Sequence, residues 1–115
     1  MNLNRMSDAI KAKIDCTLAD FEIAYGHELL APCRYILDGG FRYYRSLVCL
    51  ASANMFGNIA LALPVAVAIH FVHCASLVLD DLPSMDNSPI RREKPSCHVY
   101  FGENVAILSS HLLMI

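Results

Sequence analysis

Apolar side chains recur at three- and four-residue steps near the start of the chain, between charged positions. The series runs through Ile10, Ile14, Leu18 (with Thr17 as the alternative), Phe21 and Tyr25. Steps of three and four residues place side chains on one face of an α-helix. The pattern predicts a first helix over about residues 6–25 that packs through one apolar stripe.

A second, shorter helix is predicted from Glu28 to Leu37. Pro32 falls in its first turn, where the missing backbone N–H of proline costs little. The triplet Asp38-Gly39-Gly40 follows. Glycine reaches positive φ without strain, so we expect this triplet to end the helix.

The longest feature is the run from Ser46 to Leu79, which contains no Asp, Glu, Lys or Arg. Residues 59–79 alone are long enough to cross the hydrocarbon core of a membrane, which takes about 20 residues. Pro64, His70 and His73 argue against such a span. The run also lacks a basic flank where it meets the acidic residues after it.

The alternative to a membrane span is a buried hairpin of two helices, with a break near Gly57-Asn58. Small side chains let helices approach closely, and alanines are spread through the run: Ala51, Ala53, Ala60, Ala62, Ala66, Ala68 and Ala75. We prefer the hairpin, with its second helix covered on all sides by other helices. The protein is then not membrane-spanning.

Proline and glycine predict a loop from about Met85 to Gly102, which contains Pro89 and Pro95. A helical apolar pattern resumes from Glu103 to Ile115. No segment shows the strict alternation of apolar and polar residues that is typical of a strand. Every element that the pattern predicts is therefore helical, as in an all-α fold.

Length and composition limit the possible classes of protein. A chain of 115 residues holds one domain at most, and its 56% of hydrophobic residues exceeds what one such core needs. This excess suggests a fragment, a tight oligomer or a membrane segment. A net charge of −2 argues against nucleic acid as a partner, because no surface is strongly basic throughout.

The five cysteines are scattered and form no C-x-x-C pair, which is typical of buried thiols in a reducing compartment. The first residues are charged (Arg5, Asp8, Lys11) and lack the apolar core of a secretory peptide. We therefore expect a cytoplasmic protein.

Three carboxylates come after the apolar run: Asp80, Asp81 and Asp86. Mg²⁺ prefers carboxylate oxygens and keeps positions open for phosphate. Asp80 and Asp86 are six residues apart, more than one and a half turns, so a straight helix would not place them on one side. An irregular turn at Pro83 would let both reach one metal ion. The alternative is a solvated helix end.

Basic residues flank the acidic stretch on both sides in sequence. Arg91 and Arg92 are adjacent, so on a helix they would serve two different anions. Arg42 and Arg45 are three apart, which puts both on one helical face. Guanidinium groups match phosphate oxygens bidentately. Solvated basic patches are the alternative for each pair.

Two histidines lie in the apolar run. His73 is seven residues before Asp80, two helical turns upstream on nearly the same face, and could complete an anion pocket. The alternative for His73 is a hydrogen-bonded residue of the core. We assign that structural role to His70.

In this order the motifs resemble the trans-isoprenyl diphosphate synthases, the farnesyl and geranylgeranyl diphosphate synthase family. The run His-Cys-Ala-Ser-Leu-Val-Leu-Asp-Asp-Leu-Pro-Ser-Met-Asp-Asn at residues 73–87 is similar to the first aspartate-rich motif of that family, and the stretch from Arg91 to Glu103 is similar to the segment after it. Residues 34–51 resemble its R-Y…G-G-K-R-x-R-P segment more weakly. Departures include Phe41, Ser46, His70, Glu93 (usually glycine) and His111.

The resemblance implies the N-terminal part of an isoprenoid-synthase-type helical bundle, with residues 1–115 as a partial domain. It implies a prenyltransferase that condenses isopentenyl diphosphate with an allylic diphosphate by Mg²⁺-assisted ionisation. Asp80, Asp81 and Asp86 would hold the metal ions on the allylic diphosphate, with Arg91 beside it. The isopentenyl diphosphate would be held by Arg42, Arg45, His73 and Arg92.

The resemblance also bears on product and partners. An aromatic residue five positions before the first aspartate stops chain growth early in this family, and here that residue is Ala75, which favours geranylgeranyl or longer products. The family's second aspartate-rich motif lies beyond this sequence, so we expect the isolated chain to be inactive. A homo-oligomer is implied. The alternative is a non-catalytic remnant or small subunit that packs against an intact synthase.

Overall fold

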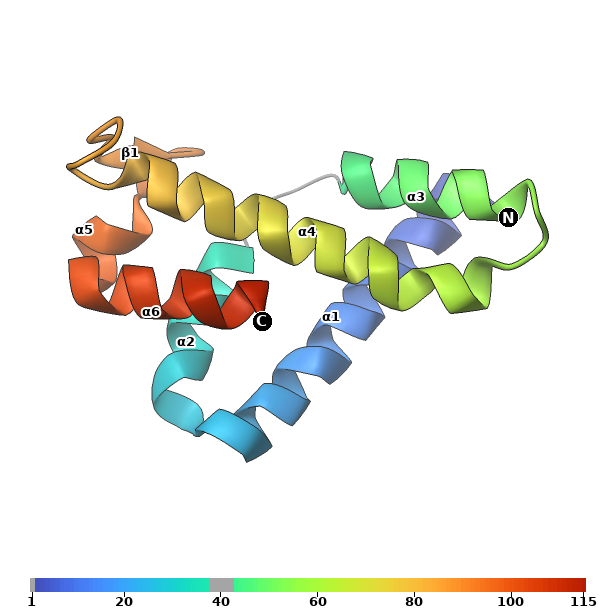
Figure 1. Ribbon diagram of the computed structural model, residues 1–115, viewed down its shortest axis with the longest axis horizontal. Coiled ribbons are helices and arrows are strands. Elements are labelled where there is room, and N and C mark those ends of the chain that lie inside the picture. The colour runs from blue at the N-terminus through green and yellow to red at the C-terminus, as the bar shows by residue number, and fades with distance from the viewer. Residues whose placement is uncertain (1, 38–42) are drawn as a thin grey trace.

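The computed structural model describes residues 2–37 and 43–115. Its elements are arranged around the helix Ile59–Asp81, labelled α4 (Figure 1). In chain order they are α1 (Leu3–Tyr25), α2 (His27–Leu37), α3 (Tyr44–Asn54), α4 (Ile59–Asp81), β1 (Ile90–Arg91), β2 (Lys94–Pro95), α5 (Cys97–Phe101) and α6 (Glu103–Met114). α3 lies beside one end of α4 and α6 beside the other, while α1 crosses behind. The predicted all-α class is confirmed.

α1 buries the predicted stripe and starts earlier than expected. The side chain of Asn2 caps it by accepting a hydrogen bond from the Arg5 N–H at 2.9 Å. Its buried residues are Met6, Ile10, Ile14 and Leu18. Tyr25, the last member of the predicted stripe, is 53% exposed, because α1 ends there and Gly26, with φ of 84°, turns the chain away.

α2 confirms the second predicted helix, but Pro32 does not lie in its first turn. The helix begins at His27, so Pro32 is in the second turn, where its missing N–H leaves the Glu28 carbonyl without its usual helical partner. Pro32 is buried against the core. The predicted stop at Asp38-Gly39-Gly40 lies outside the described residues.

The predicted helical hairpin is confirmed by α3 and α4, which pack against each other. The chain reverses through residues 55–58, where Gly57 has φ of 78° and the Asn58 N–H donates to the Ala53 carbonyl at 3.3 Å. A buried hydrogen bond joins the two helices, from the Ser46 hydroxyl to the Ala66 carbonyl at 2.6 Å. That hydrogen bond requires a small side chain, such as that of Ser46, where α3 packs against α4.

α4 is not covered on all sides within this chain, contrary to the prediction. One face is buried, with Ala66 and Phe71 among its residues, whereas Leu61 is 73% exposed and Val65 54%. Among the described residues, α4 alone is long and apolar enough to cross a membrane, a test that core helices of soluble proteins also pass.

The segment predicted as a loop contains a small β-hairpin and the helix α5, so the predictions of a loop and of no strand were wrong. β1 and β2 pair antiparallel, with Arg91 opposite Lys94 and Ile90 opposite Pro95. The two-residue turn has positive φ at both positions, 52° at Arg92 and 68° at Glu93. Such short strands carry no alternation to detect, and turns of this kind favour Asn-Gly rather than Arg-Glu.

Replacement of Glu93 by glycine tests the strain in this turn. Glu93→Gly should raise the free energy of unfolding by about 0.5–1 kcal/mol, because glycine adopts positive φ without the clash of a Cβ atom. Urea denaturation of the 115-residue chain measures the change. Asn87→Gly is the matched control: its φ is 51°, which asparagine tolerates, so the gain should be smaller. An equal gain at both positions would contradict this account.

Candidate functional site

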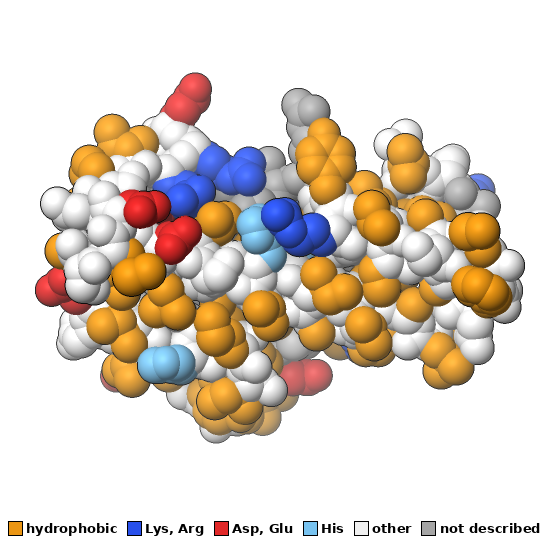
Figure 2. All heavy atoms as spheres, turned by 45° about the horizontal axis from the view of Figure 1, so that its top comes forward, with side chains coloured by type: hydrophobic (Ala, Val, Ile, Leu, Met, Phe, Trp, Pro, Cys, Tyr) orange, Lys and Arg blue, Asp and Glu red, His pale blue; other side chains and the backbone are white. Residues whose placement is uncertain are grey.

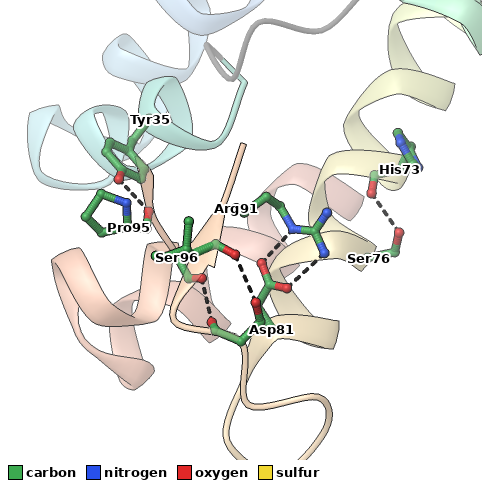
Figure 3. Close-up of polar contacts among 9 residues, drawn as sticks. Tyr35, His73, Ser76, Asp81, Arg91, Pro95 and Ser96 are labelled. Atoms are coloured by element: carbon green, nitrogen blue, oxygen red, sulfur yellow. Dashed lines mark hydrogen bonds and ion pairs between the residues drawn. The ribbon is translucent and has the colours of Figure 1, made fainter. Parts of the chain in front are cut away.

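The site is built at the carboxyl end of α4, around a buried ion pair. The Asp81 carboxylate accepts two hydrogen bonds from Arg91 of β1, from Nε at 2.7 Å and from Nη2 at 2.9 Å (Figure 3). The Asp81 side chain is 3% exposed and that of Arg91 is 35% exposed. The hydrogen bond to Asp81 raises the pKa of Arg91. Asp81, predicted as a metal ligand, thus holds the hairpin to α4.

The irregular turn expected at Pro83 is present directly after α4. The Asp86 N–H donates to the Asp80 carbonyl at 2.8 Å, and the Ser88 N–H donates to the Asp81 carbonyl at 3.0 Å. The turn therefore brings Asp86 back to the end of α4, and both Asp80 and Asp86 are exposed.

The described residues contain no group of three or more His, Cys, Asp or Glu side chains placed to hold a metal ion. The assignment of Asp80, Asp81 and Asp86 as metal ligands stays a prediction. Asp81 differs from the other two because its carboxylate already binds a guanidinium group.

Basic groups from distant parts of the chain also meet beside α4. Arg45 Nη1 on α3 lies 3.1 Å from His73 Nε2 on α4. A guanidinium can only donate, so His73 accepts through Nε2 and is neutral. Partial burial and the charges of Arg45, Arg92 and Arg91, in that order, lower the pKa of His73.

Arg45 and His73 thus join α3 to α4, and the charge of Arg92 in the hairpin acts on the same imidazole, whereas the assignment of these three residues to substrate binding stays a prediction. Arg42 lies outside the described residues, and α3 begins only at Tyr44, so a shared helical face for Arg42 and Arg45 stays a prediction. Figure 2 shows acidic, basic and histidine side chains together on one face of the molecule.

An open groove of about 440 Å³ leads away from this cluster. Arg45 and His73 line one part of it, and the apolar side chains of Val65, Ala68, Ile69 and Val72 line the rest. The groove therefore offers a positive charge next to apolar surface. This combination suits a ligand that has an anionic group attached to a hydrocarbon chain.

His70 has the structural role that the sequence suggested. It is 3% exposed, its Nε2 lies 3.5 Å from Cys74 Sγ, and the Tyr43 ring packs edge-on against it at 4.9 Å. Burial, with the charges of His73 and Arg92, lowers the pKa of His70 from 6.5 to about 4. Burial raises the pKa of Cys74 to about 12, so that thiol is not a nucleophile.

The structure also shows where Ala75 and the five cysteines lie. Ala75 is fully buried in the core, so its part in setting product length stays a prediction. The cysteines are free thiols. Cys33, Cys74 and Cys97 are buried as expected, whereas Cys16 is exposed and Cys49 is half-buried.

Sequence reasoning missed Tyr35 of α2, which contacts the hairpin. Its hydroxyl donates to the Pro95 carbonyl at 2.5 Å, and Lys94 Nζ donates to the Tyr35 carbonyl at 3.0 Å. No signal in one sequence could have found these contacts, because about 60 residues separate the partners.

The comparisons with known proteins point to one family. The polyprenyl synthetase family model matches residues 27–115. A geranylgeranyl diphosphate synthase of Cyanophora paradoxa is 44% identical over 82 residues, covering 70% of this chain and 27% of that protein. A dimethylallyltranstransferase of Fischerella ambigua is 34% identical over 113 residues, covering 97% of this chain and 32% of that protein.

Solved structures agree on the fold. The crystal structure of a geranyltranstransferase from Thermotoga maritima superposes with a TM-score of 0.88 at 31% identity, covering 97% of this chain and 42% of that one. The chain therefore spans less than half the length of these relatives.

The Asp81–Arg91 pair gives a stability prediction. Arg91→Ala should lower the free energy of unfolding by about 2–3 kcal/mol, because the buried carboxylate loses its partner; the exposure of Arg91 keeps this below the roughly 3–5 kcal/mol of a fully buried pair. Urea denaturation measures it. Arg92→Ala, at the exposed neighbour in the same hairpin, should change stability by no more than about 0.5 kcal/mol. Equal losses for the two variants would count against the pair.

His70 gives a pH prediction. Its pKa is about 4 in the folded state against an ordinary value of 6.5, so between these pH values the unfolded chain binds more protons. The free energy of unfolding should fall by up to about 3 kcal/mol as pH drops from 7 to 4. His70→Phe should flatten this dependence in urea denaturation at several pH values, whereas His111→Gln, at an exposed position, should not. A slope unchanged by His70→Phe would refute the assignment.

Proposed function

The chain belongs to the polyprenyl synthetase family, and on that basis we propose that the protein it forms part of is a prenyltransferase. The proposed reaction condenses isopentenyl diphosphate with an allylic diphosphate to give a longer isoprenyl diphosphate, geranylgeranyl or longer. The relatives named as geranylgeranyl diphosphate synthase and as dimethylallyltranstransferase support this class of reaction.

One observation carries the proposal: cationic and acidic groups meet at the same end of α4. Arg45 contacts His73 at 3.1 Å, and Arg92 lies close enough to affect the pKa of the same imidazole. The exposed carboxylates Asp80 and Asp86 follow within a short stretch of chain. This arrangement suits two diphosphates, one bound by guanidinium groups and the other through divalent cations.

The cationic cluster is the proposed site for isopentenyl diphosphate. Arg45 and Arg92 are exposed and can each present a fork of N–H donors to phosphate oxygens. His73 is neutral before the anion arrives, and an anion beside it would favour its protonated form. Arg42 is proposed as a further member from the sequence alone.

The donor set at the acidic end fits Mg²⁺. This ion is commonly held by one or two carboxylates together with phosphate oxygens and water, and Asp80 and Asp86 are two exposed carboxylates joined by a closed turn. When bound, Mg²⁺ would neutralise the charge that develops on a departing diphosphate. We propose that Asp80 and Asp86 are direct ligands and that Asp81 orients Arg91 beside them.

The remaining roles follow from shape and charge. Val65, Ala68, Ile69 and Val72 supply apolar surface next to Arg45 and His73, which suits the hydrocarbon part of a prenyl substrate. The positive charge of Arg91, fixed by Asp81, would stabilise a pyrophosphate as the allylic C–O bond ionises. The double bond of isopentenyl diphosphate would then attack the allylic carbon, and a proton would be lost.

Isothermal titration of the 115-residue chain with inorganic pyrophosphate tests the binding site. Arg45→Gln should weaken binding about tenfold or more, because a charged hydrogen bond to phosphate is lost. Arg5→Gln removes the same charge from the exposed face of α1 and should leave the affinity unchanged. Asp86→Asn should weaken binding only when Mg²⁺ is present. Equal effects of Arg45→Gln and Arg5→Gln would refute a specific site.

Turnover is tested by mixing isopentenyl and allylic diphosphates with the 115-residue chain and, separately, with the longest protein encoded in its reading frame. We expect no product from the first. The second, with Mg²⁺, should yield prenyl diphosphates. Failure of the longer protein would refute the proposed function, and recovery only with an added intact synthase would instead support a non-catalytic subunit.

A further inference from the structure

Tyr35 joins α2 to the hairpin that carries Arg91 and Arg92. Its hydroxyl donates to the carbonyl of Pro95 in β2 (Figure 3), and the ammonium group of Lys94 lies 4.1 Å from the centre of its ring. The same ammonium donates to the Tyr35 carbonyl at 3.0 Å. β2 is therefore held at two successive residues by one tyrosine.

The tyrosine ring is itself fixed by aromatic neighbours from α5. Tyr100 stacks on it with centroids 4.8 Å apart, and Phe101 meets it edge-on at 5.3 Å. Such pairs restrict the orientation of a ring. Tyr35 can therefore hold β2 in one position rather than follow its movements.

Because β1 and β2 are paired, the position of β2 also affects where Arg91 and Arg92 lie. Lys94 pairs with Arg91 across the ladder, and Arg92 is the first residue of the turn between them. Arg91 is fixed to α4 through Asp81, so β1 has an anchor of its own. β2 is anchored through Tyr35, and the two anchors together determine the direction of the turn.

The turn needs a second anchor because its backbone is strained. Arg92 and Glu93 both have positive φ, and neither is glycine or asparagine. Residues of this kind relax toward negative φ unless their surroundings hold them. With β1 alone attached, the hairpin would be free to rotate about the Asp81–Arg91 pair and carry Arg92 away from the end of α4.

We propose that Tyr35 is a positioning residue of the diphosphate site, which through its bond to Pro95 holds Arg92 against the end of α4 that carries Asp81. The proposal rests on the proposed function. Tyr35 itself touches neither diphosphate. A small cavity of about 40 Å³, lined by Tyr35, Asp81, Arg91 and Arg92 among others, lies between the two anchors.

Tyr35→Phe tests the proposal, because it deletes the hydroxyl and keeps the ring that stacks on Tyr100 and lies under Lys94. We expect the affinity of the 115-residue chain for inorganic pyrophosphate, measured by isothermal titration, to fall about three- to tenfold, as for loss of one hydrogen bond. Tyr25→Phe removes a hydroxyl from the exposed end of α1 and should leave the affinity unchanged.

A double-mutant cycle separates positioning from a general loss of stability. If Tyr35 acts through Arg92, Tyr35→Phe should have no further effect on pyrophosphate binding in an Arg92→Gln background. It should keep its full effect in an Arg45→Gln background, because Arg45 is on α3. Equal losses in both backgrounds, or no loss in either, would overturn the proposal.

The outcomes also separate this inference from the proposed function. If the unmodified chain does not bind pyrophosphate, the proposed site fails and the inference falls with it. If the unmodified chain binds, and Arg45→Gln weakens binding while Tyr35→Phe does not, the site stands and only the positioning role is overturned.

Discussion

The bidentate contact between Asp81 and Arg91 connects the acidic and basic parts of the molecule. Asp81 is the last residue of α4 and is almost fully buried, so its charge requires a partner. Arg91 supplies that partner from a hairpin ten positions away. The turn between them must close, which brings Asp86 back to Asp80, and the hairpin must lie over α4, which brings Arg92 toward His73. The ion pair thus fixes β1, Tyr35 fixes β2, and Arg92 lies in the turn between them.

The electrostatics of the site favour an anion without requiring buried positive charge. Arg45 and Arg92 keep their guanidinium groups exposed, while burial, together with the nearby positive charges, lowers the pKa of His70 and of His73. The positive charge of the site therefore lies on guanidinium groups that remain hydrated. An arriving diphosphate would replace water on them rather than meet a buried unpaired charge.

α4 carries charged residues of the site and also part of the apolar groove. Its buried face packs on the other helices through small and apolar residues, and it carries His73 and Asp81 into the site from a rigid element. Its other face leaves Leu61 and Val65 exposed, and Val65 lines the groove. A rigid helix fixes functional side chains more accurately than a loop does, whereas the hairpin opposite has to be anchored at several points.

The sequence alone was sufficient for the helices other than α5, for the break near Gly57, and for the identity of Asp80, Asp86, Arg45, His73 and Arg92 as candidates. These depend on periodicity and on motifs, which are local properties of the chain. The pairing of Asp81 with Arg91, the contact of Arg45 with His73 across 28 residues, and that of Tyr35 with Pro95 across 60 were decided by the tertiary structure. The physical reason is that a charged or polar side chain presents the same sequence signal whether it meets metal, ligand or another side chain, and only packing determines which one is within reach.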